Sequence, residues 1–158
     1  MSSFSPDNWL NIKRTVRFGE ADAAGVIHFS HLLRWCHEAW EESLDHYGLA
    51  SLDIFPSGRK GLDKLRKILP IVHCEADFFQ PIVIGDSIDI KLLPKRNSPS
   101  SFQVQYDFEF SKQKVAKGLI VHLAIDSSTK KRCNLPESIE RWIEASTLDL
   151  GEKSIDNS

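Results

Sequence analysis

The stretch FGEADAAGVIHFSHLLRWCHEAWEESLDHY, residues Phe18–Tyr47, carries the clearest structural signal in the sequence. From Phe29 onward, apolar residues recur every three or four positions, which places them on one stripe of a helix. Charged residues occupy the opposite face, and Gly48 is the residue type at which helices commonly end. The spacing predicts an amphipathic helix of about five turns, whose apolar stripe consists of Phe29, Leu32, Leu33, Cys36, Trp40, Leu44 and Tyr47.

Segments with the pattern of strands lie on both sides of this helix. Upstream, residues 12–18 alternate between two faces, which is the period of a strand. Downstream, four further segments are separated by short connections: 71–79, 88–94, 101–110 and 115–126, with 95–100 expected as a loop. Strands joined by short loops pair antiparallel, and residues 135–145 have the pattern of a short C-terminal helix. The order predicts an α+β fold in which the long helix lies across an antiparallel sheet of about five strands.

Composition narrows the class of protein. The 158 residues suit one domain, with residues 1–10 and 147–158 expected to be frayed ends. A formal net charge of -2 argues against a nucleic-acid partner, which needs a basic surface. Cys36, Cys74 and Cys133 are far apart, and we expect them to be reduced core residues of a cytoplasmic protein. No signal peptide and no apolar run of membrane-spanning length is found, so no membrane span is expected.

The sequence alone permits two interpretations of Asp22. Asp is common in turns because its carboxylate accepts backbone N–H groups, and Gly25 suits the same turn. Alternatively, a carboxylate shortly before a helix N-terminus can act on a carbonyl that the unpaired N–H groups there polarise. The sequence has no GxSxG, Walker or GxGxxG motif. His28 and His31 have no evident third ligand nearby, so no metal site is predicted.

The segment FGEADAAGVIHFSHLLRWCHEAWEESL resembles the first loop and central helix of the hotdog-fold acyl-CoA thioesterases of the 4-hydroxybenzoyl-CoA thioesterase type. The shared pattern is an Asp, two small residues, a Gly, two aliphatic residues and the helix start. Together with AAGVIHFSHLL, the segments CHEAWEESL, LPIVHCEADFFQPIVIGD and RCNLPESIERW are similar to the cyanobacterial 1,4-dihydroxy-2-naphthoyl-CoA hydrolases of phylloquinone biosynthesis. The resemblance extends over residues 12–143.

This resemblance implies a reaction and assigns site residues. The expected activity is hydrolysis of an aromatic acyl-CoA thioester, without cofactor or metal; the alternatives are another acyl-CoA, benzoyl-type or aliphatic, and a non-catalytic acyl-binding protein. Asp22 matches the catalytic carboxylate, and the backbone N–H of Phe29 matches the group that polarises the thioester carbonyl. The rival catalyst is a carboxylate on the helix, Glu38 or Glu41. The expected substrate-binding residues are Gly25, His28, His31, Lys95 and Arg96.

The resemblance also implies an assembly. In the hotdog fold the sheet wraps around the long helix, two sheets join edge to edge in a homodimer, and the active site lies between the subunits. A dimer of dimers is therefore expected, with no membrane span and no nucleic acid among its partners. His28 has two possible roles, contact with the acyl ring or with the dimer interface. Lys95 and Arg96 are either the cations that hold the CoA phosphates or residues of a solvated loop. Aromatic residues expected to help form the subunit faces are Phe78, Phe79, Phe102 and Phe108.

Overall fold

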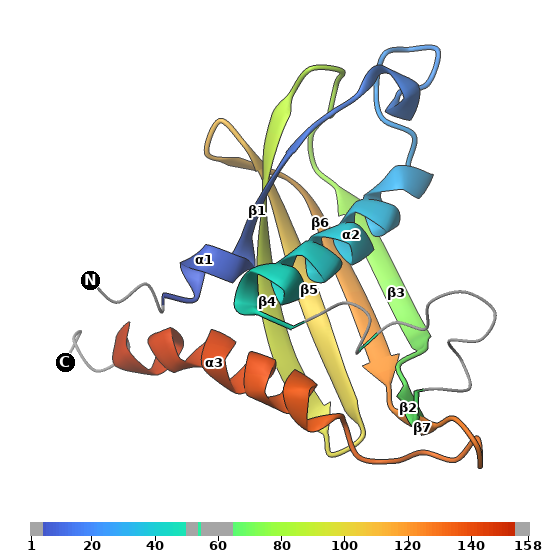
Figure 1. The fold of residues 1–158 in the computed structure, drawn as a ribbon. Helices are drawn as coiled ribbons and strands as arrows, with labels where there is room; N and C mark the ends of the chain where they lie inside the picture. The colour runs from blue at the N-terminus through green and yellow to red at the C-terminus, as the bar shows by residue number, and fades with distance from the viewer. Residues whose placement is uncertain (1–4, 50–53, 55–64, 154–158) are drawn as a thin grey trace.

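The computed structural model describes residues 5–49, 54 and 65–153. Figure 1 shows a curved sheet with one long helix lying across a single face and a second helix beside one end of that face. The elements in chain order are α1 (Asp7–Leu10), β1 (Asn11–Thr15), η1 (Phe18–Glu20), α2 (Ser30–Tyr47), β2 (Lys67–Ile68), β3 (Ile71–Phe78), β4 (Ser87–Ser98), β5 (Ser101–Phe110), β6 (Gln113–Leu123), β7 (Ile125–Asp126) and α3 (Glu137–Lys153).

The main sheet has five antiparallel strands in the order β1-β4-β5-β6-β3. The β4, β5 and β6 strands follow one another through tight hairpins, whereas β3 joins the far side of β6 and becomes an edge. The short strands β2 and β7 form a separate pair at the beginning of β3. The predicted α+β architecture is therefore confirmed, and the five-stranded sheet with α2 lying across one face is the arrangement that the resemblance to the hotdog fold implies.

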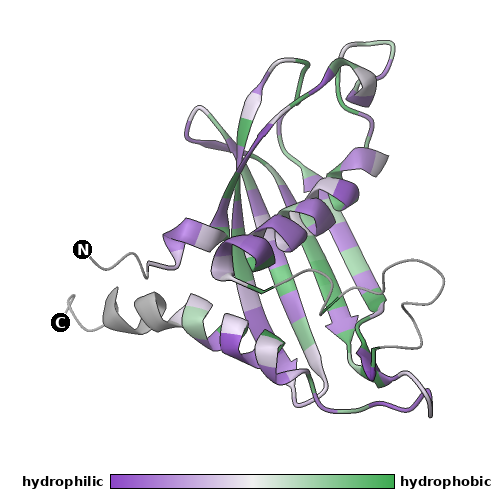
Figure 2. Ribbon diagram, in the orientation of Figure 1, coloured by the Kyte–Doolittle hydropathy of each residue, from purple (hydrophilic) through white to green (hydrophobic). Residues whose placement is uncertain are grey.

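Helix α2 forms where the apolar periodicity predicts it. It ends at Gly48, whose φ of +106° is left-handed and whose N–H donates to the Leu44 carbonyl at 3.1 Å. Glycine adopts this conformation without the steric cost that a side chain would add. The outward face of α2 is largely hydrophilic (Figure 2), while its inward face is buried. This division of faces fixes which side of the helix meets the sheet.

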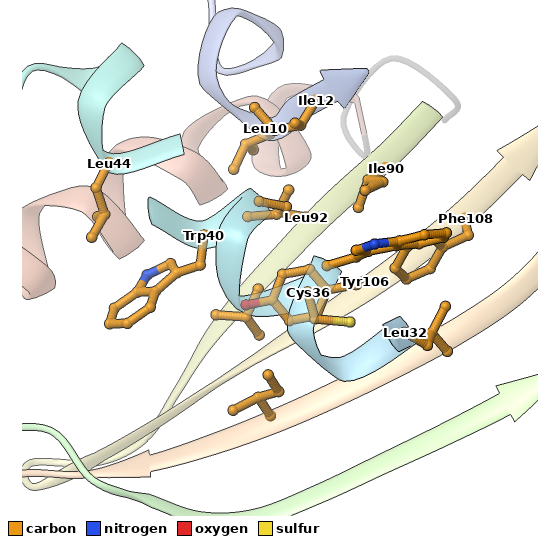
Figure 3. Close-up of a cluster of buried hydrophobic side chains, with 14 of the residues drawn as sticks. Leu10, Ile12, Leu32, Cys36, Trp40, Leu44, Ile90, Leu92, Tyr106 and Phe108 are labelled. Carbon is orange, nitrogen blue, oxygen red and sulfur yellow. The ribbon is translucent and has the colours of Figure 1, made fainter. Parts of the chain in front are cut away.

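The core lies between α2 and the strands at the centre of the sheet. Figure 3 shows Cys36 and Trp40 of the helix close to Leu92 of β4 and Tyr106 of β5. Burying one such large side chain contributes about 2 kcal/mol. Alternate residues of β5 face this core and are fully buried, as the alternation predicts: Phe102, Val104, Tyr106 and Phe108.

The buried position of Phe102 and Phe108 corrects one expectation. Both side chains have 0% exposure under the helix, so they form the core and no subunit face. Phe78 and Phe79, by contrast, are exposed. Cys36 is a core residue as expected, but Cys74 lies exposed on β3, like the other residues of that strand.

Several element boundaries differ from the sequence pattern. Strand β1 ends at Thr15, with Phe18 in η1 and not in the strand, and the strand expected over residues 115–126 divides into β6 and β7. Strand β4 continues to Ser98, so Lys95 and Arg96 lie in a strand and not in the expected loop. Helix α3 continues to Lys153, beyond the end expected near residue 145. At the other terminus, Trp9 and Leu10 are buried in α1, and the Trp9 indole donates to Ser146 of α3 at 2.9 Å. No helix among the described residues combines the length and hydrophobicity of a membrane span.

Candidate active site

A tight loop between η1 and α2 presents Asp22. The Asp22 N–H donates to the Val26 carbonyl at 2.8 Å, and the Gly25 N–H donates to the Asp22 carbonyl at 3.0 Å. Gly25 has a φ of +81°, which an L side chain rarely adopts. This left-handed residue turns the chain back so that Ala21 and Ile27 can pair. Gly25 therefore gives the loop its shape.

The Asp22 carboxylate has one oxygen bound within the loop. Its Oδ1 accepts the Ala24 N–H at 2.8 Å and lies 3.4 Å from the Val26 N–H. Its Oδ2 has no hydrogen-bond partner among the described residues, and the side chain is exposed. Asp22 caps the turn and not the helix, which begins only at Ser30. The turn interpretation and the reactive one are compatible, because each uses a different oxygen.

The start of α2 leaves one backbone donor free. The N–H of Ser30 donates to Nδ1 of His28 at 3.3 Å, and the N–H of His31 donates to the His28 carbonyl at 3.0 Å. The N–H of Leu32 donates to the Phe29 carbonyl at 3.4 Å. The N–H of Phe29 has no acceptor among the described residues. A free N–H in the positive field of a helix N-terminus is suited to bind a developing oxyanion.

An open apolar pocket of about 390 Å³ adjoins this donor. The turn after β3 forms one wall, and the start of α2 with the end of the Asp22 loop forms the other. Phe29, which lines this pocket, is 70% exposed in the isolated chain. The Gln80 side chain is the one polar group among the lining residues, which are Val26, Ile27, Phe29, Phe78, Phe79, Gln80, Pro81 and Ile82.

Below the loop, a buried carboxylate is surrounded by donors. Glu20 is 5% exposed and accepts the Trp35 indole N–H at 2.5 Å and the Arg17 backbone N–H at 2.9 Å. Its Oε2 also accepts from Arg14 at 2.5 Å and from Arg34 at 3.1 Å. Burial alone would raise the pKa of Glu20, but these donors outweigh it and lower the pKa to about 2. Glu20 is therefore ionised at neutral pH.

The two histidines expected to bind substrate lie at the helix start. The Nδ1 of His28 lies 2.7 Å from the Ser30 hydroxyl, and the His28 ring packs on Phe29 with centroids 4.4 Å apart. Since Nδ1 accepts from Ser30, the proton of the neutral ring is on Nε2. The ring of His31 lies 6.3 Å from that of His28 and is half-buried. Neither ring lines the pocket of the isolated chain.

Lys95 and Arg96 lie far from this pocket within one chain. Their distance can be counted along β5, where Arg96 pairs with Phe102. Phe78 at the pocket wall pairs with Ala116 of β6, which in turn pairs with Phe108 of β5. Six residues of one strand span about 20 Å. Arg96 also forms an ion pair with Glu140 of α3 at 3.2 Å.

The two rival carboxylates on α2, Glu38 and Glu41, form ion pairs with other side chains. Glu38 binds Arg14 at 2.7 Å and Arg34 at 3.5 Å. Glu41 forms an i, i+4 pair with His37 at 3.0 Å. Glu38 lies nine residues beyond Phe29, which is about 13 Å along a helix. The geometry therefore favours Asp22 over either rival as the reactive carboxylate.

Fold and site together define a hotdog protein with a carboxylate loop at the start of its wrapped helix. Residues 16–143 match the thioesterase-like superfamily, and the chain belongs to that family.

Relatives and solved structures agree with this assignment. A Prochlorococcus marinus (strain SARG) protein named 1,4-dihydroxy-2-naphthoyl-CoA hydrolase is 54% identical over 98% of this chain and 100% of its own length. A protein of the same name from Synechococcus sp. (strain CC9902) is 56% identical over 89% of this chain and 93% of its own. The crystal structure of the 1,4-dihydroxy-2-naphthoyl-CoA thioesterase from Synechocystis superposes with a TM-score of 0.76 at 29% identity, covering 89% of this chain and 97% of that chain.

Proposed function

We propose that this protein hydrolyses an aromatic acyl-CoA thioester, 1,4-dihydroxy-2-naphthoyl-CoA, in phylloquinone biosynthesis. The observation that carries the reaction type is the free N–H of Phe29 at the wall of an apolar pocket, next to the loop that presents Asp22. Thioester hydrolysis needs an oxyanion donor and a nucleophile or base, and these two groups supply them. The acyl group is taken from the names of relatives that are about half identical over nearly their whole length.

The reaction follows from the two groups. The thioester carbonyl oxygen accepts the Phe29 N–H, which makes the carbonyl carbon more electrophilic. The free Oδ2 of Asp22 either removes a proton from water, whose oxygen adds to that carbon, or attacks the carbon itself. In both routes the tetrahedral intermediate expels the CoA thiolate, which takes up a proton. Water supplies the second acid oxygen directly in the first route and by hydrolysis of an acyl–Asp22 anhydride in the second.

The pocket supports an aromatic acyl group. Its lining is apolar except for Gln80, and the three phenylalanine rings offer flat faces to a bicyclic acid. Gln80 lines the pocket and the His28 ring packs on Phe29 at the helix start, so these two side chains are the proposed hydrogen-bonding partners of ring hydroxyls. A second ring adds apolar area worth about 1–3 kcal/mol, which corresponds to roughly tenfold to a hundredfold in kcat/KM.

We further propose that the protein works as a homodimer or a dimer of dimers. All eight residues of β3 are exposed in one chain, and β3 is an edge of the sheet. Cys74 and Ala76 of β3 pair in register with Ile120 and Gly118 of β6, so the paired residues lie on the same side of the sheet. On β6 this side faces the helix and is buried, whereas on β3 it is exposed. A second copy paired through β3 would cover this face and complete the pocket wall near Phe78.

Lys95 and Arg96 are the residues that we propose to hold the CoA phosphates. Lys95 and Arg96 lie about 20 Å from the pocket of their own chain by strand length, so their contribution to phosphate binding requires another subunit.

A cytoplasmic location is supported by three free cysteines, as expected in a reducing compartment.

The test is a comparison of acyl-CoA thioesters, with release of the free thiol followed by absorbance. We expect kcat/KM to be highest for 1,4-dihydroxy-2-naphthoyl-CoA, lower for benzoyl-CoA and lowest for hexanoyl-CoA. A preference for the aliphatic chain would overturn the acyl assignment and leave the reaction type intact. If none of the thioesters is hydrolysed while the protein still binds them, the fold serves as an acyl-binding module and the enzymatic proposal is wrong.

A further inference from the structure

Glu20 contacts three separate parts of the chain through its side chain. Its carboxylate accepts from Trp35 and Arg34 of α2, from Arg14 of β1 and from the backbone N–H of Arg17. Arg14 in turn lies over the Trp35 ring, with its guanidinium carbon 4.8 Å from the ring centroid. One buried carboxylate therefore joins the first strand, the wrapped helix and the beginning of the loop.

The backbone of Glu20 holds the other end of the same loop. Its carbonyl accepts the N–H of His28 at 3.2 Å. Asp22 follows Glu20 by two residues, and Phe29 follows His28 by one. The nine-residue segment from Glu20 to His28 thus begins at an anchored side chain and closes on the same residue's carbonyl.

We infer that Glu20 is a positioning residue that fixes the Asp22 carboxylate relative to the free N–H of Phe29. This inference rests on the proposed thioester hydrolysis. The reacting groups must be held to within a fraction of an ångström, and a misplacement of about 1 Å can cost a hundredfold in rate. Glu20 itself lies below the loop, does not line the pocket and has its oxygens occupied by donors, so it takes no part in the proton transfer.

The chain offers a matched control in Glu38. This residue binds the same two guanidinium groups, Arg14 at 2.7 Å and Arg34 at 3.5 Å, from the exposed side of α2. It makes no hydrogen bond to the loop of residues 21–28. Glu38→Gln therefore removes a carboxylate from the same ionic network and leaves the anchor of the loop in place.

The experiment compares Glu20→Gln with Glu38→Gln on the thioester that the wild-type protein hydrolyses best, well below the unfolding temperature of each variant. In Glu20→Gln we expect kcat to fall about tenfold to a hundredfold and KM to change less than about twofold, because the pocket itself is intact. In Glu38→Gln we expect both constants to stay within about twofold of the wild type. Hydrogen exchange measured by NMR should show faster exchange of the His28 amide in Glu20→Gln only, with the amides of β4 and β5 unchanged.

A second variant covers the case in which Glu20→Gln fails to fold. Arg34 is half exposed, so Arg34→Gln should fold, and it removes one donor from Glu20. We expect a smaller fall in kcat, about threefold, together with faster exchange of the His28 amide. Equal kcat values in the wild type, Arg34→Gln and any folded Glu20→Gln would overturn the inference, as would an equal loss in Glu20→Gln and Glu38→Gln. A wild-type protein that hydrolyses no thioester would instead refute the proposed function.

Discussion

The Cα of Gly118 on β6 lies so close to the Sγ of Cys36 on α2 that a Cβ added to the glycine would be 2.4 Å from that sulfur. The absence of a side chain at this one position therefore sets how near the wrapped helix can approach the sheet. The contact predicts the outcome of a double-mutant cycle. Gly118→Ala should lower the free energy of unfolding by about 1–3 kcal/mol, because the core is overpacked.

Cys36→Ala removes the sulfur that the new methyl group would meet. In the Gly118→Ala background it should therefore restore stability, whereas in the wild type it should cost about 1 kcal/mol by leaving a small cavity. Urea unfolding of the four proteins gives the coupling energy between the two positions. Additive effects would show that the helix can move away from β6 without cost.

Asp22→Asn should leave a folded protein whose kcat is at least about a hundredfold lower, the lower scale of acid–base contributions. The amide keeps an oxygen for the Ala24 N–H but provides neither a nucleophile nor a base. Asp86→Asn is the matched control, because Asp86 also accepts a loop N–H, that of Val83 at 3.0 Å, and lines no part of the pocket. Its kcat should stay within about twofold. Near-normal turnover of Asp22→Asn would move the assignment to a helix carboxylate.

His122 should make the protein less stable in mild acid. Its ring is buried against Phe102 and Trp40, and its Nδ1–H donates to the Leu69 carbonyl at 3.0 Å. Burial lowers the pKa from 6.5 to about 4, even though the Leu69 carbonyl acts in the opposite direction and the nearby His37 adds to the decrease. Between these two pKa values the unfolded chain binds one proton more than the folded chain, so stability falls as the pH falls.

The difference between these pKa values corresponds to about 3 kcal/mol by pH 4. Urea unfolding at several pH values from 7 to 4 measures this slope in the wild type and in His122→Phe, which keeps an aromatic ring in the stack. We expect the slope to be smaller in the variant by one proton. Identical slopes in the two proteins would mean that His122 titrates normally in the folded state.

Light scattering should find the wild-type protein at twice or four times the mass of one 18.0 kDa chain. Ala76→Arg places a charge on the exposed, helix-side face of β3, and should yield a smaller species with lower kcat/KM. Asn11→Arg is the control, because Asn11 is exposed on β1 at the opposite edge of the sheet. A wild-type monomer with full activity would contradict the proposed assembly.

The sequence predicted what depends on local periodicity. The stripe of α2 and the alternation of β5 repeat over ten or more residues, so their core faces could be assigned before the fold was known. The end of β4 could not, because its polar residues resemble a loop. Residues 95–98 extend the strand because they pair with residues 101–103 across the hairpin. Alternation also shows which side of β3 a residue occupies, but not whether any element covers it.

The site was predicted only in part, for a similar reason. Asp22 and Phe29 belong to one continuous motif, whereas Glu20 contacts residues 6 to 15 positions away on two other elements, β1 and α2. Contacts of this kind produce no periodic pattern of residues in the sequence. The wall after β3, including Gln80, was missed because pocket walls are formed by segments far apart in the chain. An acidic residue two positions before Asp22, in an otherwise small-residue loop, was the available signal for Glu20.

The free N–H of Phe29 separates two properties of the enzyme that usually change together, the activation of the thioester and the choice of acyl group. In the proposed mechanism the main chain of residue 29 binds the reacting carbonyl, while the same residue lines the pocket proposed for the acyl group. Any residue except proline keeps that N–H. Evolution can therefore alter the ring at this position to admit a different acid without altering the group that activates the thioester. On that proposal, reactivity belongs to the backbone and selectivity to the side chain, which would allow one scaffold to diversify its substrates by single substitutions.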